Sequence, residues 1–272
     1  MEYTPKRITG NVNISKTSPI REFLILVLGI GGALVALYMV LGLALNLVVP
    51  RLSPELEDHL SGLFAGYYAD EDPSSPAQES LQGILDRLVS QGAHSERAYR
   101  VHVVPNPLVN AMALPGGHIV VYTGLLDKVE SENEVAMVLG HELGHFKNRD
   151  HLRGLGRALV LMALSTATLG IDSQVSKILQ TLLVNTEMKF SQKQELLSDV
   201  WGLELLTGVY GHAGGATDFF KRMSQEDKHG PVAYFFATHP YPKKRVLSLE
   251  SMIQEKDYEL LETIPLALPG KE

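Results

Sequence analysis

The sequence predicts an α+β protein, mostly helical with a small β-sheet, that carries one N-terminal transmembrane helix. Three observations predict this class: a long uncharged stretch near the N-terminus, several segments with apolar residues at helical spacing, and short runs of β-branched and aromatic residues between them. A chain of 272 residues accommodates an anchor and one compact domain. We expect a cytoplasmic tail over 1–21, a transmembrane anchor over 22–50, a helical lead-in over 51–95 and the main domain over 96–272.

The predicted anchor is a stretch from Phe23 to Val49 that contains no charged side chain and one strongly polar one, Asn46. As a helix rising about 1.5 Å per residue it would be roughly 40 Å long, enough to span a bilayer with some tilt. The stretch is longer than the apolar core of a signal peptide, and the residues before Pro50 form a poor cleavage site. We therefore expect residues 23–49 to stay attached and to contact the lipid bilayer.

The charges that flank this stretch predict its orientation. The basic residues before it are Lys6, Arg7, Lys16 and Arg21, whereas Arg51 after it is soon followed by Glu55, Glu57 and Asp58. The positive-inside rule then places the N-terminus in the cytoplasm and the main domain outside, in the periplasm if the anchor lies in a bacterial inner membrane. Small residues in the stretch are compatible with a homo-oligomer but do not establish one.

Two helices and a small sheet are expected next. Ser53 and Pro54 suit a helix start, and apolar residues continue at helical spacing as far as Tyr67. A second amphipathic helix carries its apolar stripe over 81–88. We interpret both stripes as core. Runs of β-branched and aromatic residues then predict strands over 99–104 and 118–122, with a further strand over 110–114 near the edge of the sheet.

The most informative segment is His141-Glu142-Leu143-Gly144-His145. Ser131 and Glu134 form a capping-box pattern, which predicts a helix running through this segment. Two histidines four residues apart lie on one face of a helix and can reach the same zinc ion, while Glu142 can act on a water beside the metal. This H-E-x-x-H pattern is typical of zinc hydrolases, most often metalloproteases.

A catalytic zinc ion needs a third protein ligand and one open position. The first candidate is His151, because the chain has the metzincin spacing H-E-x-x-H-x-x-G-x-x-H except that Asn148 replaces the glycine. The second candidate is Glu195, which we expect on a helix over about 184–206, one turn before Asp199. One of these two carboxylates could bind zinc while the other orients a histidine. The residues alone leave both candidates open.

Four segments, in this order, resemble the motifs of the M48 peptidase family of zincins. They are Asn110–Gly117, His141–His145, Glu195–Asp199, and Thr238–Pro240 followed by Arg245. The resemblance covers roughly residues 80 to 250. It departs from the family pattern at Gln192, where the family often has Arg, and at Ser198, where the family usually has Ala. Neither departure removes a predicted metal ligand.

The resemblance implies a zincin-like fold with one Zn²⁺ per chain, bound by His141, His145 and Glu195. It also implies that Asp199 supports the site from behind the ligands and that His151 is not a ligand. In this family the third ligand is the glutamate of the E-x-x-x-D motif, so the resemblance favours the second of the two candidates.

The resemblance also implies catalytic roles. Glu142 would be the general base that takes a proton from the attacking water and later passes it to the leaving amine. His239 would donate a hydrogen bond to the developing oxyanion, although it could equally be a loop residue or a removable fourth ligand. Arg245 would hold the loop of His239 in place through a carboxylate.

The predicted edge strand suggests how a substrate could bind. An exposed strand edge can hold an extended peptide by main-chain hydrogen bonds, a mode that selects extended segments rather than one sequence. We expect this edge to face the active-site cleft. The candidate substrate-binding residues are Asn110, Ala111, Met112 and Ala113.

One further apolar stretch, residues 158–171, is too short to cross a bilayer comfortably. It could be a buried helix or a surface that dips into the membrane. A single extra crossing would place Glu195 across the bilayer from His141, so we reject it.

Composition excludes other classes. The net charge of −7 argues against nucleic-acid binding, and the absence of cysteine excludes disulfides and thiolate metal ligands. The motifs and the family resemblance together predict a membrane-anchored zinc endopeptidase, and the resemblance implies that its substrates are extended or misfolded envelope or membrane proteins. The alternative is a non-proteolytic, zinc-containing chaperone or assembly factor that binds unfolded chains at the edge strand.

Overall fold

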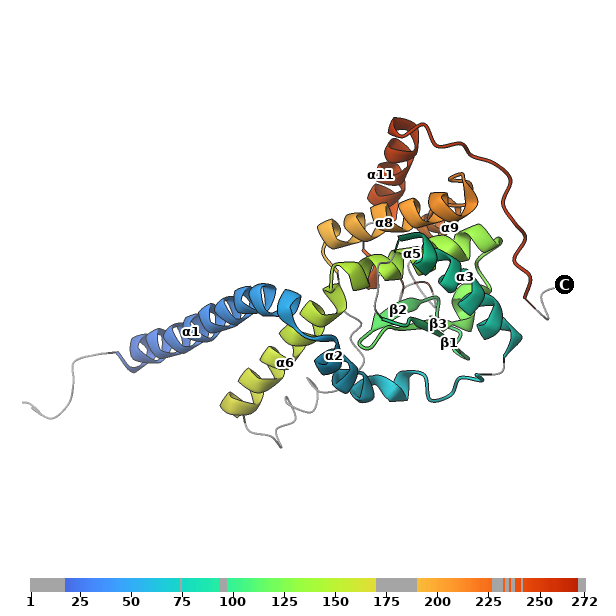
Figure 1. Ribbon diagram of the computed structural model, residues 1–272. Coiled ribbons are helices and arrows are strands. Elements are labelled where there is room, and N and C mark those ends of the chain that lie inside the picture. The colour runs from blue at the N-terminus through green and yellow to red at the C-terminus, as the bar shows by residue number, and fades with distance from the viewer. Residues whose placement is uncertain are drawn as a thin grey trace, which may run out of the picture.

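The computed structural model describes residues 18–73, 75–92, 97–169, 190–226, 232, 235, 238–240 and 242–268. It confirms a mostly helical α+β chain with a small mixed sheet and an apolar N-terminal helix (Figure 1). The helices are α1 (Pro19–Val48), α2 (Pro54–Ser61), α3 (Pro76–Gly92), α4 (Thr123–Leu126), α5 (Glu132–Lys147), α6 (Asp150–Leu169), α8 (Gln192–Tyr210), α9 (Asp218–Gln225) and α11 (Pro242–Glu255), and the strands are β1 (Arg100–Val104), β2 (Ala111–Leu114) and β3 (His118–Tyr122). Most of the expected tail, 1–17, lies outside the described residues.

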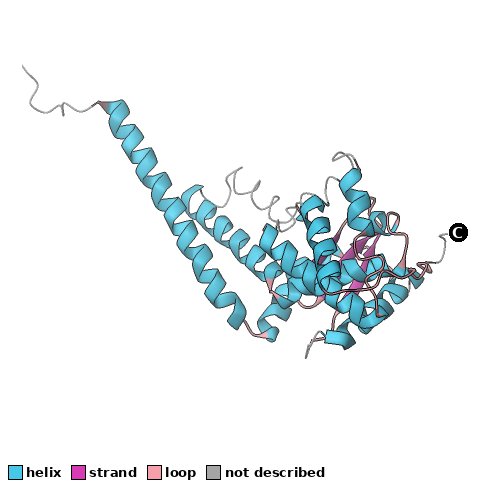
Figure 2. Cartoon of the chain, turned by 90° about the horizontal axis from the view of Figure 1, so that it is seen from above, coloured by secondary structure: helices cyan, strands magenta, loops and turns pink. Residues whose placement is uncertain are grey.

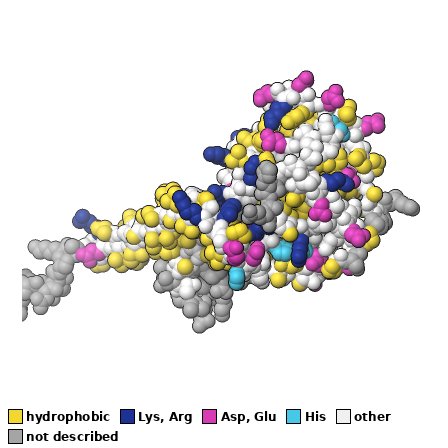
Figure 3. Space-filling view, viewed as in Figure 1, with side chains coloured by type: hydrophobic (Ala, Val, Ile, Leu, Met, Phe, Trp, Pro, Cys, Tyr) yellow, Lys and Arg dark blue, Asp and Glu magenta, His cyan; other side chains and the backbone are white. Residues whose placement is uncertain are grey.

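Helix α1 projects away from the rest of the chain (Figures 1 and 2). Together with the following 3-10 turn Val49–Arg51, it is long and apolar enough to cross a membrane, and its apolar side chains are largely exposed (Figure 3). The end of α1 is fixed to the main domain by Arg149, whose Nη1 donates hydrogen bonds to the carbonyl oxygens of Val49 at 3.0 Å and Leu52 at 2.7 Å. Such a helix suggests membrane association.

Helix α6 lies beside α1 (Figures 1 and 2). The two pack closely at Gly156, where an added Cβ would lie 2.7 Å from Cδ2 of Leu45. The helix covers the predicted apolar stretch 158–171 except for its last two residues, which lie outside the described residues. The described side chains of this stretch, at 158–160, 163, 164 and 166, are half-buried or exposed, so they give no support to the buried-helix alternative.

The lead-in contains both predicted helices, with one difference. Ser53 caps α2, and the chain continues from Gly62 to Tyr67 as a 3-10 helix instead of an α-helix. The predicted apolar stripe is core only in part: Phe64 and Tyr67 pack against the sheet, but on α2 Leu56 is 47% exposed and Glu57 is buried instead. The reason is that Glu57 has ionic partners on the main domain. Helix α3 is as predicted, with its stripe over 81–88 buried.

The sheet has the strand order β1-β3-β2, with β1 parallel and β2 antiparallel to the central β3. The predicted strands therefore form, and β2 pairs with β3 alone among the described strands. Successive side chains point to opposite faces. One face packs with α3 and α5 in the main core and includes Ala111, Ala113 and Ile119. The other face packs against aromatic residues of the 3-10 helix, Phe64 and Tyr67.

Helix α8 begins later than predicted. Residues 184–189 lie outside the described part, and Phe190 and Ser191 precede the helix. The Ser191 hydroxyl accepts from the backbone N–H of Gln194, and the Gln194 side chain meets the backbone of Ser191, which together form a capping box. The helix ends at Gly211, which adopts the left-handed conformation with φ of 76°.

Candidate metal centre

Helices α5 and α8 cross at glycines, which allows their backbones to touch. An added Cβ on Gly140 would lie 3.0 Å from Cα of Gly202, and an added Cβ on Gly144 would lie 2.6 Å from Cα of Ser198. A side chain at either position would therefore push the helices apart. This close crossing brings the acidic face of α8 directly against the two histidines of the H-E-x-x-H segment.

Four buried side chains converge at this crossing: His141, His145, Glu195 and His239. Nε2 of His141 lies 3.1 Å from Nε2 of His145 and 3.3 Å from Nδ1 of His239. The Glu195 carboxylate lies 3.7 Å from His141 Nε2, 3.5 Å from His145 Nε2 and 3.3 Å from His239 Nδ1. Zinc bonds of about 2.0–2.1 Å at tetrahedral angles separate neighbouring ligand atoms by about 3.3 Å, so the donor set fits a tetrahedral metal ion.

The far nitrogens of two of these histidines face carboxylates. Nδ1 of His141 lies 2.8 Å from Oδ1 of Asp199, and Nδ1 of His145 lies 3.2 Å from Oδ2 of Asp150. A carboxylate that accepts a proton from Nδ1 leaves Nε2 free to bind a metal. The hydroxyl of Ser198 also lies 3.1 Å from Nδ1 of His145. Both rings are thus oriented with Nε2 toward the same point.

Arg245 neutralises the acidic side of the cluster. This buried guanidinium donates to Asp199 through Nε at 2.8 Å and Nη2 at 2.6 Å, and its Nη1 lies 2.6 Å from Oε2 of Glu195. Burial raises the pKa values of the two carboxyls, but the charge of Arg245 and the hydrogen bonds and charges of the neighbouring histidines together outweigh burial and hold both pKa values below their ordinary values. Both carboxylates are therefore ionised, as metal binding requires.

Glu142 lies beside the cluster but is not part of it. The side chain is buried, and Oε1 lies 3.7 Å from Nε2 of His239. Its other oxygen, Oε2, has no hydrogen-bond partner among the described residues. A buried carboxylate oxygen without a donor is costly, and such groups are uncommon outside functional sites. This oxygen is therefore free to accept a hydrogen bond.

The raised pKa of the His145 imidazole leads to a first prediction. Burial lowers its pKa, but hydrogen bonds to Asp150 and Glu195 and the nearby Glu142 charge outweigh burial and raise it to about 9. Because zinc binds only an unprotonated nitrogen, zinc uptake at pH 7.5 should release about one proton from this ring. The expected zinc affinity rises with pH up to about 9. Calorimetry in buffers of different ionisation enthalpy measures the release, and identical heats in all buffers would contradict the prediction.

Comparison with known proteins identifies the family. Residues 75–253 match the family model described as Peptidase family M48. This chain belongs to peptidase family M48. The predicted family and the predicted class, a metalloendopeptidase, are thereby confirmed at the level of the family.

Individual relatives agree with this membership. The chain is 31% identical over 184 residues to mitochondrial metalloendopeptidase OMA1 of Schizosaccharomyces pombe, a match that covers 66% of this chain and 54% of the relative. It is 34% identical over 202 residues to metalloprotease LoiP of Escherichia coli, covering 65% of this chain and 79% of the relative. The chain thus spans about half the length of the yeast relative and more of the bacterial one.

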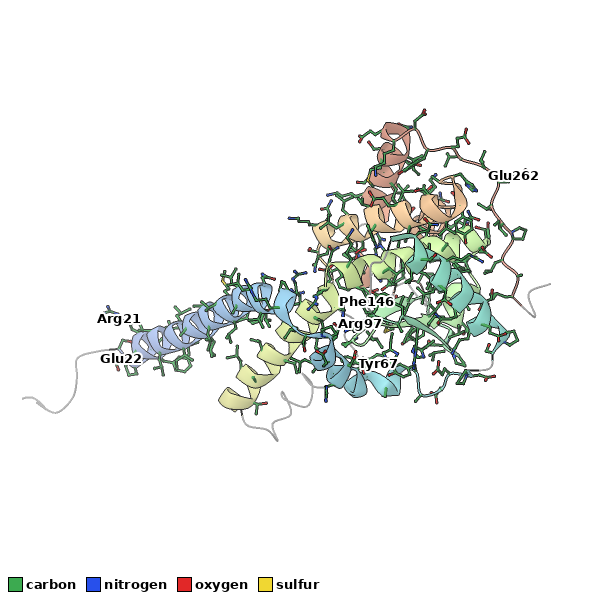
Figure 4. All side chains as sticks on the ribbon, in the orientation of Figure 1. Arg21, Glu22, Tyr67, Arg97, Phe146 and Glu262 are labelled. Atoms are coloured by element: carbon green, nitrogen blue, oxygen red, sulfur yellow. The ribbon has the colours of Figure 1, made fainter. Side chains whose placement is uncertain are left out.

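In this M48 peptidase, His151 lies away from the metal centre. Helix α5 ends at Lys147, and the left-handed residue that follows is Arg149, with φ of 53°, instead of Asn148. Helix α6 then carries His151 toward α2, where its Nε2 lies 3.0 Å from Oε1 of Glu57. The metzincin alternative finds no support in this arrangement. Figure 4 shows the neighbouring Arg97, whose Nη1 lies 2.8 Å from the same Glu57 oxygen.

The candidate substrate residues lie on or next to β2. Asn110 is fully buried, and its Oδ1 accepts a hydrogen bond of 3.4 Å from the hydroxyl of Thr238. Two of the M48 motifs therefore contact each other. The side chains of Ala111 and Ala113 are buried in the core, and Met112 is half-buried. Of these four side chains, Met112 is thus the one that reaches the surface.

Sequence reasoning missed two residues of this M48 centre. Asp150 contacts His145, and Phe190 stacks on the His145 ring with centroids 3.7 Å apart. A carboxylate five residues after a ligand histidine was a weak signal for Asp150. No sequence signal pointed to Phe190, because its distance from His145 along the chain says nothing about stacking.

Proposed function

We propose that this M48 peptidase is a membrane-anchored, zinc-dependent endopeptidase that cleaves extended or misfolded polypeptides. The observation that carries the proposal is the set of four buried donor atoms at tetrahedral separations, with the unpartnered carboxylate of Glu142 beside it. Imidazole nitrogens and a carboxylate oxygen are donors that suit zinc. The proposed ligands are His141, His145 and Glu195.

The proposed chemistry is hydrolysis of a peptide bond. His141, His145 and Glu195 would hold the zinc ion, which when bound would supply Lewis acidity toward water and the scissile carbonyl. Glu142 takes the proton of the attacking water and passes it to the leaving amine. Arg245 keeps Glu195 and Asp199 ionised, and Asp199 and Asp150 hold the histidine rings in the tautomer that binds metal.

His239 has two proposed roles at different stages. Its Nδ1 lies 3.3 Å from both His141 Nε2 and Glu195, a position that suits a fourth ligand. Four protein ligands leave no open position, so this arrangement suits a resting enzyme. When the loop Thr238–Pro240 moves, the ring of His239 becomes free to donate a hydrogen bond to the oxyanion.

The proposed substrate site is the free edge of β2. The strand pairs with β3 alone among the described strands, and its motif contacts the loop of His239 through Asn110 and Thr238. A peptide added to this edge would be held by main-chain hydrogen bonds. Backbone groups that are already paired within a folded protein cannot form these hydrogen bonds, so this mode favours extended or misfolded chains. Met112 would contact a substrate side chain.

The proposed location is a membrane crossed once by α1. The helix carries Arg21 and Glu22 at its far end (Figure 4), and the 3-10 turn that joins it to the main domain carries Arg51. Together with the basic residues before Arg21 in the sequence, this pattern supports a cytoplasmic N-terminus and an extracytoplasmic metal centre, with the helix in an inner membrane.

A Glu142→Gln variant tests the proposed function. Glutamine keeps the size of the side chain but cannot accept the proton, so we expect unchanged zinc content and a fall in peptidase activity of about 10²–10⁴-fold. The full-length protein in detergent would be assayed on unfolded casein, with Glu55→Gln, an exposed glutamate of α2, as the matched control. If Glu142→Gln retains both zinc and the cellular function, the chaperone alternative is preferred.

A further inference from the structure

A cavity outside the metal centre lies where α1 meets the main domain. Its volume is about 780 Å³, and it lies between the end of α1, the junction of α5 and α6, and the start of α8. Five basic side chains line it: Lys147, Arg149, Arg153, Arg157 and Lys193. The proposed peptidase chemistry uses none of these five.

Basic side chains outnumber acidic ones in the lining of this cavity by five to one. Its lining contains one acidic residue, Asp150, which is buried and already accepts from Gln194 at 2.7 Å and contacts Arg153 at 3.2 Å. No carboxylate pairs with Arg157 or Lys193 within the described part of the chain. The whole chain carries a net charge of −7, so a cavity lined by five basic residues has the opposite sign of charge to the protein as a whole.

The cavity lies at a defined depth relative to α1. Asn46 and Pro50, which line it, belong to the last turn of the apolar stretch and the residue just after it. The first residues of α6 line the cavity, and the helix packs beside α1, with Gly156 against Leu45. Figure 3 shows Lys and Arg gathered at this junction, where the yellow apolar surface of α1 ends. If α1 spans a bilayer, this level is that of the lipid headgroups.

We propose that this cavity binds the phosphate group of an anionic phospholipid from the leaflet that faces the main domain. The proposal rests on the membrane anchoring in the proposed function. Guanidinium and ammonium groups are the side chains that bind phosphate esters, arginine through paired hydrogen bonds and lysine as a point charge. The acyl chains of such a lipid would lie along the apolar surfaces of α1 and α6.

The single tryptophan of the chain, Trp201, reports on this cavity. Nζ of Lys147 lies 2.9 Å from the centroid of the Trp201 ring, so a phosphate that draws Lys147 away changes the surroundings of the indole. The full-length protein in a nonionic detergent would be titrated with short-chain phosphatidylglycerol. We expect a saturable change in tryptophan fluorescence, no such change with phosphatidylcholine, and at most a far weaker response to inorganic phosphate.

Two double variants test where the lipid binds. Arg157→Gln with Lys193→Gln removes two charges from the cavity but keeps the reporter pair, and we expect roughly 30-fold weaker binding of phosphatidylglycerol. Lys221→Gln with Lys243→Gln removes the same charge from a half-buried position on α9 and an exposed position on α11, both outside the cavity lining, and binding should be unchanged. Native mass spectrometry of the same samples counts the retained lipids, which gives a second readout independent of fluorescence.

Three results would overturn the proposal: equal affinity in both double variants, an equal response to phosphatidylcholine, or equal affinity for free phosphate, which would indicate a simple anion site. Failure of the proposed peptidase function is distinguishable. The lipid titration requires no activity and can be repeated on Glu142→Gln, whereas zinc content and casein cleavage of the cavity variant show whether its metal centre is intact.

Discussion

A Glu195→Ala variant is expected to lose its zinc, whereas a His151→Ala variant keeps it. Glu195 contributes the carboxylate of the four-membered cluster, and alanine leaves three imidazoles beside Arg245, which then has Asp199 as its remaining carboxylate partner. A structural zinc site in peptides is worth on the order of 10 kcal/mol, so loss of one ligand weakens binding by several orders of magnitude. His151 contacts Glu57 of α2 and is not part of the four-membered cluster, so its removal should leave the cluster unchanged.

The measurement is the zinc content of purified full-length protein after dialysis, for the wild type and both variants. His151→Ala is a demanding control because the residue is buried like a ligand and lies in the metzincin position. Its removal leaves Glu57 with Arg97 as a partner, so we expect a loss of unfolding free energy of about 1–3 kcal/mol and full zinc content. Zinc lost from His151→Ala but kept by Glu195→Ala would assign the site to the metzincin arrangement instead.

Much of this fold could be predicted because local patterns agree with the tertiary structure. The apolar residues over 81–88 repeat at helical spacing and are buried, and the β-branched runs form strands as expected. The position of β1 beside β3 could not be read from the sequence, because strand order depends on long-range pairing. The exposure of Leu56 and the burial of Glu57 on α2 could not be predicted for a similar reason, because the partners of Glu57 lie far from it in the sequence.

The candidate site shows a similar division. Spacing within α5 predicts that His141 and His145 share a face, and the spacing of Glu195 and Asp199 does the same for α8. Only the family resemblance indicated that these two faces meet. The contacts of Asp150 and Phe190 with His145 could not be predicted, because they depend on the turn after α5 and on the approach of the chain to α8.

A Gly144→Ala variant tests whether the close helix crossing holds the metal centre together. The added Cβ would lie 2.6 Å from Cα and 2.9 Å from Cβ of Ser198, closer than packed carbon atoms allow. The first of these contacts is backbone, so relief requires α8 to move. Glu195 lies one turn before Ser198 on α8, and a shift of about 1 Å would stretch its distances to His141 and His145 well beyond those of a tetrahedral site.

We therefore expect Gly144→Ala to lower the unfolding free energy of the metal-free protein by about 1–3 kcal/mol and to weaken zinc binding at least tenfold. Gly83→Ala is the matched control, because Gly83 lies within helix α3 and an added Cβ there meets nothing within 4 Å. Alanine at that position should stabilise the protein by about 0.5–1 kcal/mol and leave zinc binding unchanged. Both substitutions add the same methyl group and the same helix propensity, so a difference between them isolates the crossing. If Gly144→Ala behaves like Gly83→Ala in denaturant unfolding and zinc titration, the contact between α5 and α8 does not set the ligand geometry.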